Sequence, residues 1–129
     1  MEELSEKKAS VEAPAVAYRR YLEKGKLGYQ RCTDCSAAVF YPRVLCPLCG
    51  SSSLEWCESV GRGTVYATTA VHSRNRAPRN VVLVDLDQGF RMMSRVEGVP
   101  ADEVEIGTRV RFEAHQVDEP VAVFVREES

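Results

Sequence analysis

The sequence has no long hydrophobic run, only two histidines, and a small aromatic share of 8%. Its longest apolar candidate, residues 81–84, ends at Asp85, far short of the roughly eighteen residues of a membrane span. The first residues are polar and mixed in charge, so we expect no signal peptide, a cytoplasmic location and reduced thiols. At a net charge of −2, the chain also lacks the basic excess typical of nucleic-acid-binding proteins.

Cysteine, in contrast, is present in a distinctive pattern. Two Cys-x-x-Cys pairs are separated by ten residues and supply Cys32, Cys35, Cys46 and Cys49. A two-residue gap lets a tight turn aim both thiolates of a pair at one ion, and four sulfurs make a tetrahedral site. We therefore predict a tetrathiolate metal site. Zinc is favoured, and iron stays the alternative because both metals suit this ligand set. The alternative of two disulfides fits a reducing compartment poorly.

The expected role of this metal is structural. Four protein ligands leave no open coordination position for water or substrate. A ribbon of about thirty residues buries too little apolar surface to fold alone, so metal binding should supply much of its folding free energy. Gly50 suits the turn after the second pair, whereas Ser36 makes the first turn less typical. The fifth thiol, Cys57, is expected to be a small buried hydrophobic residue.

Positive charge is concentrated in the middle of the chain. Residues 60–99 carry six arginines against three acids, whereas residues 100–129 carry three arginines against eight acids. Arg74, Arg76 and Arg79 crowd into one predicted loop, where they form a candidate anion-binding site. The alternative is a solvated loop whose arginines pair with local acids.

We divide the chain into four segments: a flexible tail (1–13), a helix (14–26), a zinc ribbon (27–59) and an all-β unit (60–129). Pro14 can open the helix and Gly25 can end it. Tyr18 and Tyr21 recur on one face of this helix. The two rings are expected either to pack on the body of the protein or to dock a partner, because tyrosine is enriched at interfaces.

Five strands with a period of two are predicted after residue 60, with a helical turn between residues 100 and 105 before the fourth. This pattern predicts a small five-stranded Greek-key barrel of the OB type, and an open β-sandwich is the alternative. The residues expected to share one face of each of four strands are Val65, Ala67, Thr69 and Val71; Phe90, Met92, Ser94 and Val96; Val110, Phe112 and Ala114; and Val121, Val123 and Val125. Residues 81–86 form an almost wholly apolar second strand.

Single-stranded nucleic acid is the alternative ligand of such a barrel. Many OB-folds bind it on strands two and three, through aromatic stacking beside a basic groove. Only Phe90 is aromatic on those strands here, although Arg91 and Arg95 keep this alternative open.

Independent catalysis is not expected. The residues with suitable chemistry show no recognisable nucleophile or acid–base signature; they are His72, His115, Cys57, Asp85 and Asp87. Each histidine continues the alternation of a predicted strand and is interpreted as a polar residue at a strand end.

The order of several short motifs resembles one known family. They are Tyr41-Pro-Arg43, Cys46-Pro-Leu-Cys49-Gly50, Leu54-Glu-Trp56, the segment Gly61 to Tyr66, and Ile106-Gly-Thr-Arg-Val110. From about residue 14 to 126 the chain is similar to the domain-of-unknown-function family numbered thirty-five. The resemblance implies an N-terminal helix and rubredoxin-like zinc ribbon joined to a C-terminal OB-fold. Ser36 departs from the glycine that this family usually has.

The resemblance also implies a function in acyl-CoA metabolism. Family members associate with thiolase-like acyltransferases, ketoacyl-CoA synthases, hydratases or aldolases, and the partner is usually the catalyst. We therefore expect a non-catalytic accessory subunit, whose arginine loop would contact the phosphates of acyl-CoA because arginine binds phosphate bidentately. Self-association into a homo-oligomer is left open.

Overall fold

The computed structural model describes residues 13–116 and 120–127. The flexible tail predicted for residues 1–13 lies outside the described residues, apart from Ala13. Within the described ranges, no helix is long and apolar enough to cross a membrane.

The predicted N-terminal helix is present as α2, Pro14–Glu23. Pro14 fits the first turn because its missing N–H would have no partner within the helix there. Leu22 is the buried residue of this helix. Gly25, just past the end, has a φ of 76°, a left-handed conformation that glycine adopts without steric cost.

Three short antiparallel strands form the ribbon: β1 (Leu27–Cys32), β2 (Ala38–Val39) and β3 (Leu54–Ser59). Their order is β2-β1-β3, so β1 is central. It pairs with β3 along its whole length, from Leu27 opposite Ser59 to Cys32 opposite Leu54. Because β1 leads directly to the first cysteine, the packing of this strand positions one side of the predicted metal site.

The remaining strands form a closed barrel: β4 (Arg62–Ser73), β5 (Arg76–Leu86), β6 (Arg91–Ser94), β7 (Val96–Glu97), β8 (Arg109–Gln116) and β9 (Pro120–Arg126). Their order is β6-β5-β4-β8-β9-β7, and β7 pairs with β9 in parallel. Only Arg95 separates β6 from β7, so this parallel pair closes the sheet on itself. The OB-fold prediction is confirmed, with the third predicted strand divided in two and the predicted helical turn present as the 3-10 helix η1 (Ala101–Glu103).

A buried side chain accounts for the division of the third strand. The Asn80 amide donates a hydrogen bond to the Val96 carbonyl (2.9 Å) and accepts one from the Val96 N–H (2.7 Å). The backbone carbonyl of Arg95 accepts a bond from Phe124 N–H at 2.9 Å. Asn80 thus satisfies the backbone polar groups of Val96, at the point where the chain passes from β6, which pairs with β5, to β7, which pairs with β9.

Two predicted strand faces are wrong. A β-bulge lies between Val65 and Ala67, so the residues after it change face: Val65 pairs with Val84, but Ala67 pairs with Leu83. Ala67, Thr69 and Val71 therefore lie opposite to the face of Val65. In β9, Phe124 is the fully buried aromatic in the barrel core, and the predicted row Val121, Val123 and Val125 points the other way. Val123 is nevertheless buried, on the side of β9 where α2 packs.

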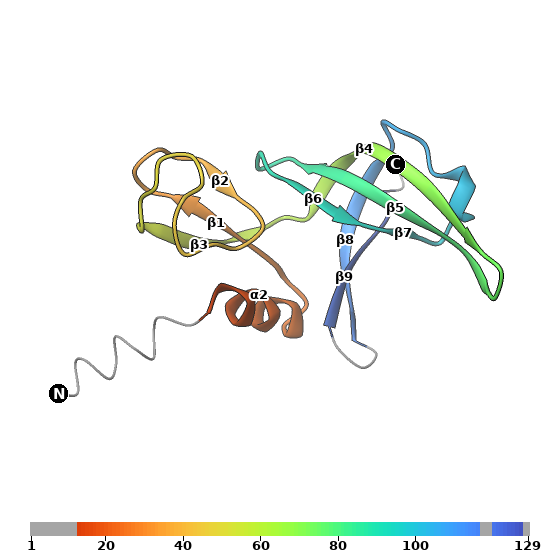
Figure 1. Ribbon diagram of the computed structural model, residues 1–129, viewed down its shortest axis with the longest axis horizontal. Coiled ribbons are helices and arrows are strands. Elements are labelled where there is room, and N and C mark those ends of the chain that lie inside the picture. Colours follow the sequence, from red (N-terminus) through yellow and green to blue (C-terminus); the bar gives the residue numbers. More distant parts are fainter. Residues whose placement is uncertain (1–12, 117–119, 128–129) are drawn as a thin grey trace.

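One hydrophobic core joins the ribbon to the barrel. The ring of Phe90, at the start of β6, stacks on Tyr29 of β1 (centroids 4.8 Å apart) and on Phe40 after β2 (5.1 Å). Arg31 also donates to the backbone carbonyl of Gln88 in the β5–β6 turn (3.3 Å). Figure 1 shows the ribbon at one end and the tip of the β4–β5 hairpin at the other, with α2 below the ribbon. The shared core makes the ribbon and the barrel one packed unit.

Candidate functional site

The four predicted cysteines converge at the outer end of the ribbon. The Cys32 and Cys49 sulfurs are 3.5 Å apart, those of Cys35 and Cys46 are 3.7 Å apart, and all four lie within 4.8 Å of one another. Metal–sulfur bonds of about 2.3 Å in a tetrahedron place sulfurs about 3.8 Å apart. The donor set and its spacing therefore fit a tetrathiolate metal ion, and the chain binds a metal through these four cysteines.

The two turns that carry the cysteines have matching backbone geometry. In the first, Ser36 N–H donates to the Cys32 carbonyl, and in the second, Gly50 N–H donates to the Cys46 carbonyl, both at 2.8 Å. Ser36 has a φ of 66° and Gly50 a φ of 79°. Ser36 thus adopts the left-handed conformation that the turn requires, at the steric cost that a side chain brings there.

The electrostatics of the thiol cluster favour a bound cation. The backbone N–H of Cys49, followed by that of Leu48, lowers the pKa of Cys46 to about 7, although burial opposes this. Ser51 N–H lowers the pKa of Cys49, but Cys32, burial and the other two thiols outweigh it and raise this pKa to about 12. Four sulfurs so close together cannot all ionise without a positive charge between them, and a divalent metal supplies it.

The three predicted arginines lie on what we call the arginine arm, residues 72–79 at the tip of the β4–β5 hairpin, which projects beyond the barrel (Figure 1). Arg74, Arg76 and Arg79 are all exposed, and none forms an ion pair with the described part of the chain. No acid lies between Glu58 and Asp85 in the sequence, so the arm has no local counter-charge. Pairing with local acids is therefore not observed within the described residues, and anion binding stays a prediction.

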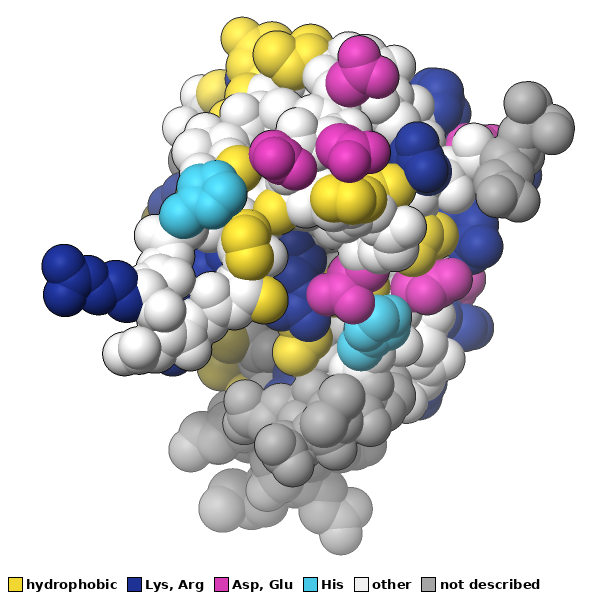
Figure 2. All heavy atoms as spheres, turned by 90° about the vertical axis from the view of Figure 1, so that its right-hand side faces the viewer, with side chains coloured by type: hydrophobic (Ala, Val, Ile, Leu, Met, Phe, Trp, Pro, Cys, Tyr) yellow, Lys and Arg dark blue, Asp and Glu magenta, His cyan; other side chains and the backbone are white. Residues whose placement is uncertain are grey.

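A small hollow lies at the base of the arm. It measures about 200 Å³ and is lined by Arg79 and Arg95, among others. Arg95 Nε forms an ion pair with Glu97 Oε2 at 2.6 Å, so one of the two positive charges that line the hollow is neutralised. Figure 2, which looks onto this end of the molecule, shows acidic side chains over the middle of the face and a basic side chain projecting clear of it.

The two helix tyrosines pack against the chain itself. Tyr21 stacks on Trp56 of β3, with centroids 5.4 Å apart, and its ring presses on Gly28, where a Cβ atom would lie 2.7 Å from it. Tyr18 contacts the edge of Phe40, and burial, with the nearby Tyr41 second, raises the pKa of Tyr18 to about 12. The structure thus shows the first of the two alternatives, and docking of a partner by these rings stays a prediction.

The candidate catalytic residues are dispersed. His72 is exposed on the arginine arm, and Cys57 is partly buried against the main core. His115 lies between Glu97 (3.8 Å) and Glu113 (3.5 Å) on the outside of the barrel. Among the described residues, neither histidine contacts Cys57, so no nucleophile and base come together.

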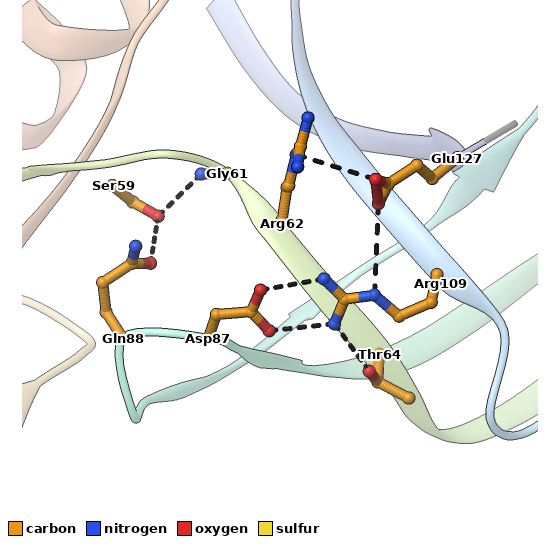
Figure 3. Close-up of polar contacts among 8 residues, drawn as sticks. All are labelled: Ser59, Gly61, Arg62, Thr64, Asp87, Gln88, Arg109 and Glu127. Carbon is orange, nitrogen blue, oxygen red and sulfur yellow. Dashed lines mark hydrogen bonds and ion pairs between the residues drawn. The ribbon is translucent and has the colours of Figure 1, made fainter. Parts of the chain in front are cut away.

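The two candidate aspartates are each engaged by an arginine. Asp85 binds Arg91, and Asp87 accepts two hydrogen bonds from Arg109, at 2.9 and 2.8 Å. Figure 3 shows Arg109 between Asp87 and Glu127, with Arg62 on the far side of Glu127. The hydrogen bonds from Arg109 hold the pKa of Asp87 below its usual range. These contacts tie the β5–β6 turn to β4 and β8, which is a structural role.

The OB-fold surface that binds nucleic acid in other proteins is poor in free aromatic rings here. Phe90 is buried in the junction with the ribbon and cannot stack on a base. The bulge in β4 turns the Tyr66 side chain outward. The sequence analysis did not identify Tyr66, because no glycine or proline marks the bulge. Its ring is covered by the Arg91 guanidinium, 3.5 Å from the centroid, which Asp85 neutralises.

Comparison with known proteins gives two adjacent matches. The family model described as "ChsH2, rubredoxin-like zinc ribbon domain" matches residues 19–55, and that described as "ChsH2, C-terminal OB-fold domain" matches residues 56–115. A solved structure described as "Ltp2-ChsH2(DUF35) aldolase" superposes with a TM-score of 0.78 at 27% sequence identity, covering 90% of this chain and 96% of the other.

Two curated relatives carry descriptive names. A "Probable enoyl-CoA hydratase alpha subunit" of Thermomonospora curvata is 32% identical over 97 residues, which is 72% of this chain but 30% of the relative's length. A "DUF35 domain-containing scaffold protein" of Methanothermobacter thermautotrophicus is 26% identical over 108 residues, covering 79% of this chain and 81% of the relative.

Proposed function

Because this chain belongs to the DUF35 family, in which a rubredoxin-like zinc ribbon is joined to an OB-fold, we propose that it is a non-catalytic accessory subunit of acyl-CoA metabolism. In this proposal it binds a thiolase-like or ketoacyl-CoA synthase-like enzyme in the cytoplasm, and that partner performs the chemistry. The names of the relatives support an association with acyl-CoA metabolism and a scaffolding role.

One observation carries this proposal: the four cysteines that lie together are all ligands of the metal, so none of them is free to act as a nucleophile. A closed tetrathiolate site has no position for a substrate. The other residues suited to catalysis are dispersed or engaged by arginine across the described part of the chain. A protein built in this way acts through its surfaces, and zinc is the proposed structural ion because closed four-cysteine sites in zinc ribbons are typical structural zinc sites.

The arginine arm is the proposed anion-binding element of this subunit. Its three exposed arginines have no acidic partners within the described residues, and they suit the phosphates of acyl-CoA. Replacing Arg74, Arg76 and Arg79 together by alanine should weaken acyl-CoA binding to the assembled complex, which isothermal titration calorimetry measures. Unchanged acyl-CoA affinity together with unchanged partner assembly would remove this role.

The central experiment is purification of the tagged full-length chain from its native cell, followed by mass spectrometry of the bound proteins and metal analysis of the same sample. We expect a stoichiometric thiolase-like protein and one colourless zinc ion per chain. A red sample with a reversible redox wave would indicate iron and electron transfer instead. Salt-dependent retention on single-stranded DNA or RNA, without a protein partner, would favour the nucleic-acid alternative and refute the proposal.

A further inference from the structure

Exposed apolar side chains gather at the second metal-binding turn. Ten large hydrophobic residues are exposed in the described part of the chain, and five of them lie together here. Four come from the stretch 41–48, and the fifth, Met93, offers its backbone N–H to the Tyr41 hydroxyl at 3.0 Å. We call this surface the knuckle face: Tyr41, Val44, Leu45, Leu48 and Met93. Exposed apolar side chains that are grouped in this way, rather than scattered singly, mark interaction sites on soluble proteins.

The knuckle face is held rigidly although it is exposed. The side chain of Gln30, itself only 3% exposed, donates to the Arg43 carbonyl (2.8 Å) and accepts from the Arg43 N–H (2.7 Å). The metal ligand Cys46 fixes the chain three residues further on. A patch ordered before binding loses little conformational entropy when a partner covers it, so its apolar area converts efficiently into affinity.

The charge around the face also fits an interface. Residues 36–53 contain a single charged side chain, Arg43, and no acid. Arg43 is exposed and has no ion-pair partner within the described ranges. The centres of protein interfaces have few charged residues and are enriched in tyrosine, methionine and arginine, which is the composition of this face.

We propose that the knuckle face is the contact surface for the partner enzyme, which presents an apolar patch with a carboxylate opposite Arg43. This inference rests on the proposed function, because it assigns a surface to that partner. A second copy of the chain fits less well: a two-fold contact would bring two Arg43 side chains together on a face that contains no acid. A foreign surface with a carboxylate supplies the missing charge.

The test measures the affinity of full-length variants for the purified thiolase-like protein that co-purifies with the wild type. Leu48→Asp and Val44→Asp place a charge on side chains that are 78% and 68% exposed, and Ile106→Asp is the matched control, at 69% exposed on the barrel. We expect Kd to rise by about 30-fold or more for each knuckle-face variant, as for an interface hot spot. Ile106→Asp should stay within about twofold. Arg43→Glu should slow association and reverse the dependence on salt.

Metal content and the emission of Trp56 verify that each variant is folded. Val44 lies outside the Cys46–Cys49 turn, so Val44→Asp keeps the test valid if Leu48→Asp loses its metal. Equal partner affinity for wild type and folded Val44→Asp overturns the inference but leaves the proposed function intact. Absence of any enzyme partner for the wild type overturns both. A wild-type dimer that Val44→Asp converts to a monomer, seen by analytical ultracentrifugation, would assign the face to self-association and overturn the inference.

Discussion

Removal of the metal should unfold the two cysteine-bearing turns and also weaken the barrel, through the core that the ribbon and the barrel share. The turns, residues 32–53, contain little that holds them together otherwise. Besides Cys32 and Cys46, their buried cluster has one buried apolar side chain, Val39, with Ala37 and Leu54 partly buried against it. So little buried apolar surface cannot offset the conformational entropy of ordering the turns. The binding free energy of the metal, on the order of 10 kcal/mol, therefore supplies most of what keeps them folded.

The effect on the barrel follows from the shared core. Phe40 comes directly after β2, and its ring packs on both Phe90 and Tyr18. When the turns unfold, Phe40 leaves and exposes part of Phe90, a change comparable to a large-to-small core substitution of about 3 kcal/mol. For a chain of this length that corresponds to a fall in Tm of roughly 10–15 °C. The inner part of β1, anchored by Tyr29, should remain paired.

Hydrogen exchange with mass spectrometry and thermal unfolding by circular dichroism can measure both effects after treatment with a chelator. We expect amide protection to be lost across residues 33–53 and kept in β4, β5 and β8, together with the lower Tm. Cys57→Ser removes a thiol that is not a ligand and should behave like the wild type, whereas Cys35→Ser should resemble the metal-free protein. Protection that persists in residues 33–53 of the metal-free chain would refute the reasoning, as would a Tm that falls by less than about 3 °C.

Three further predictions concern single positions. Ser36→Gly should raise the free energy of unfolding by about 1 kcal/mol, because glycine adopts the left-handed turn without steric cost, and it should leave metal stoichiometry unchanged; a lower denaturant midpoint would contradict this. Phe90→Ala should cost about 3–5 kcal/mol and lower the stability reported by both Trp56 and the barrel strands, whereas an effect on one of them alone would mean that the core is not shared. Asp87 has a depressed pKa in the folded protein, so its contribution is present above its unfolded pKa of about 4 and is lost as pH falls through the folded value. Asp87→Asn should therefore flatten the pH dependence of the denaturant midpoint below about pH 4, and an unchanged slope would show that the Arg109 pair contributes nothing.

The metal ligands and the fold class were predictable because each depends on local pattern. The spacing of the cysteine pairs specifies a shared ion without reference to the rest of the chain. Alternation with a period of two specifies strands, and their number and turns suit an OB barrel. The division of the third strand was not predictable, because it depends on Asn80 reaching Val96 across the sheet.

The errors arose where tertiary contacts decide which face is buried. The face shared by Phe90, Met92 and Val96 was predicted correctly, but the contacts of Phe90 with Tyr29 and Phe40 could not be predicted, because they depend on how the ribbon packs on the barrel. The β4 bulge at Tyr66 has no sequence signal, so alternation with a period of two places Ala67, Thr69 and Val71 on the wrong face. In β9 nearly every residue is apolar, and alternation alone cannot tell Phe124 in the core from Val123 beside α2.

The knuckle face and the arginine arm lie at opposite ends of the molecule (Figure 1), and their chemistry differs in a way that allows them to act independently. Apolar contact at the knuckle face responds weakly to salt, whereas charge–charge contact on an exposed hairpin is screened over about 8 Å at physiological ionic strength. The shared core that holds the ribbon against the barrel keeps the two surfaces at a fixed separation. One surface can therefore retain an enzyme at the ribbon end while the other engages an anion at the barrel end, and raising the salt concentration should release the anion before the enzyme.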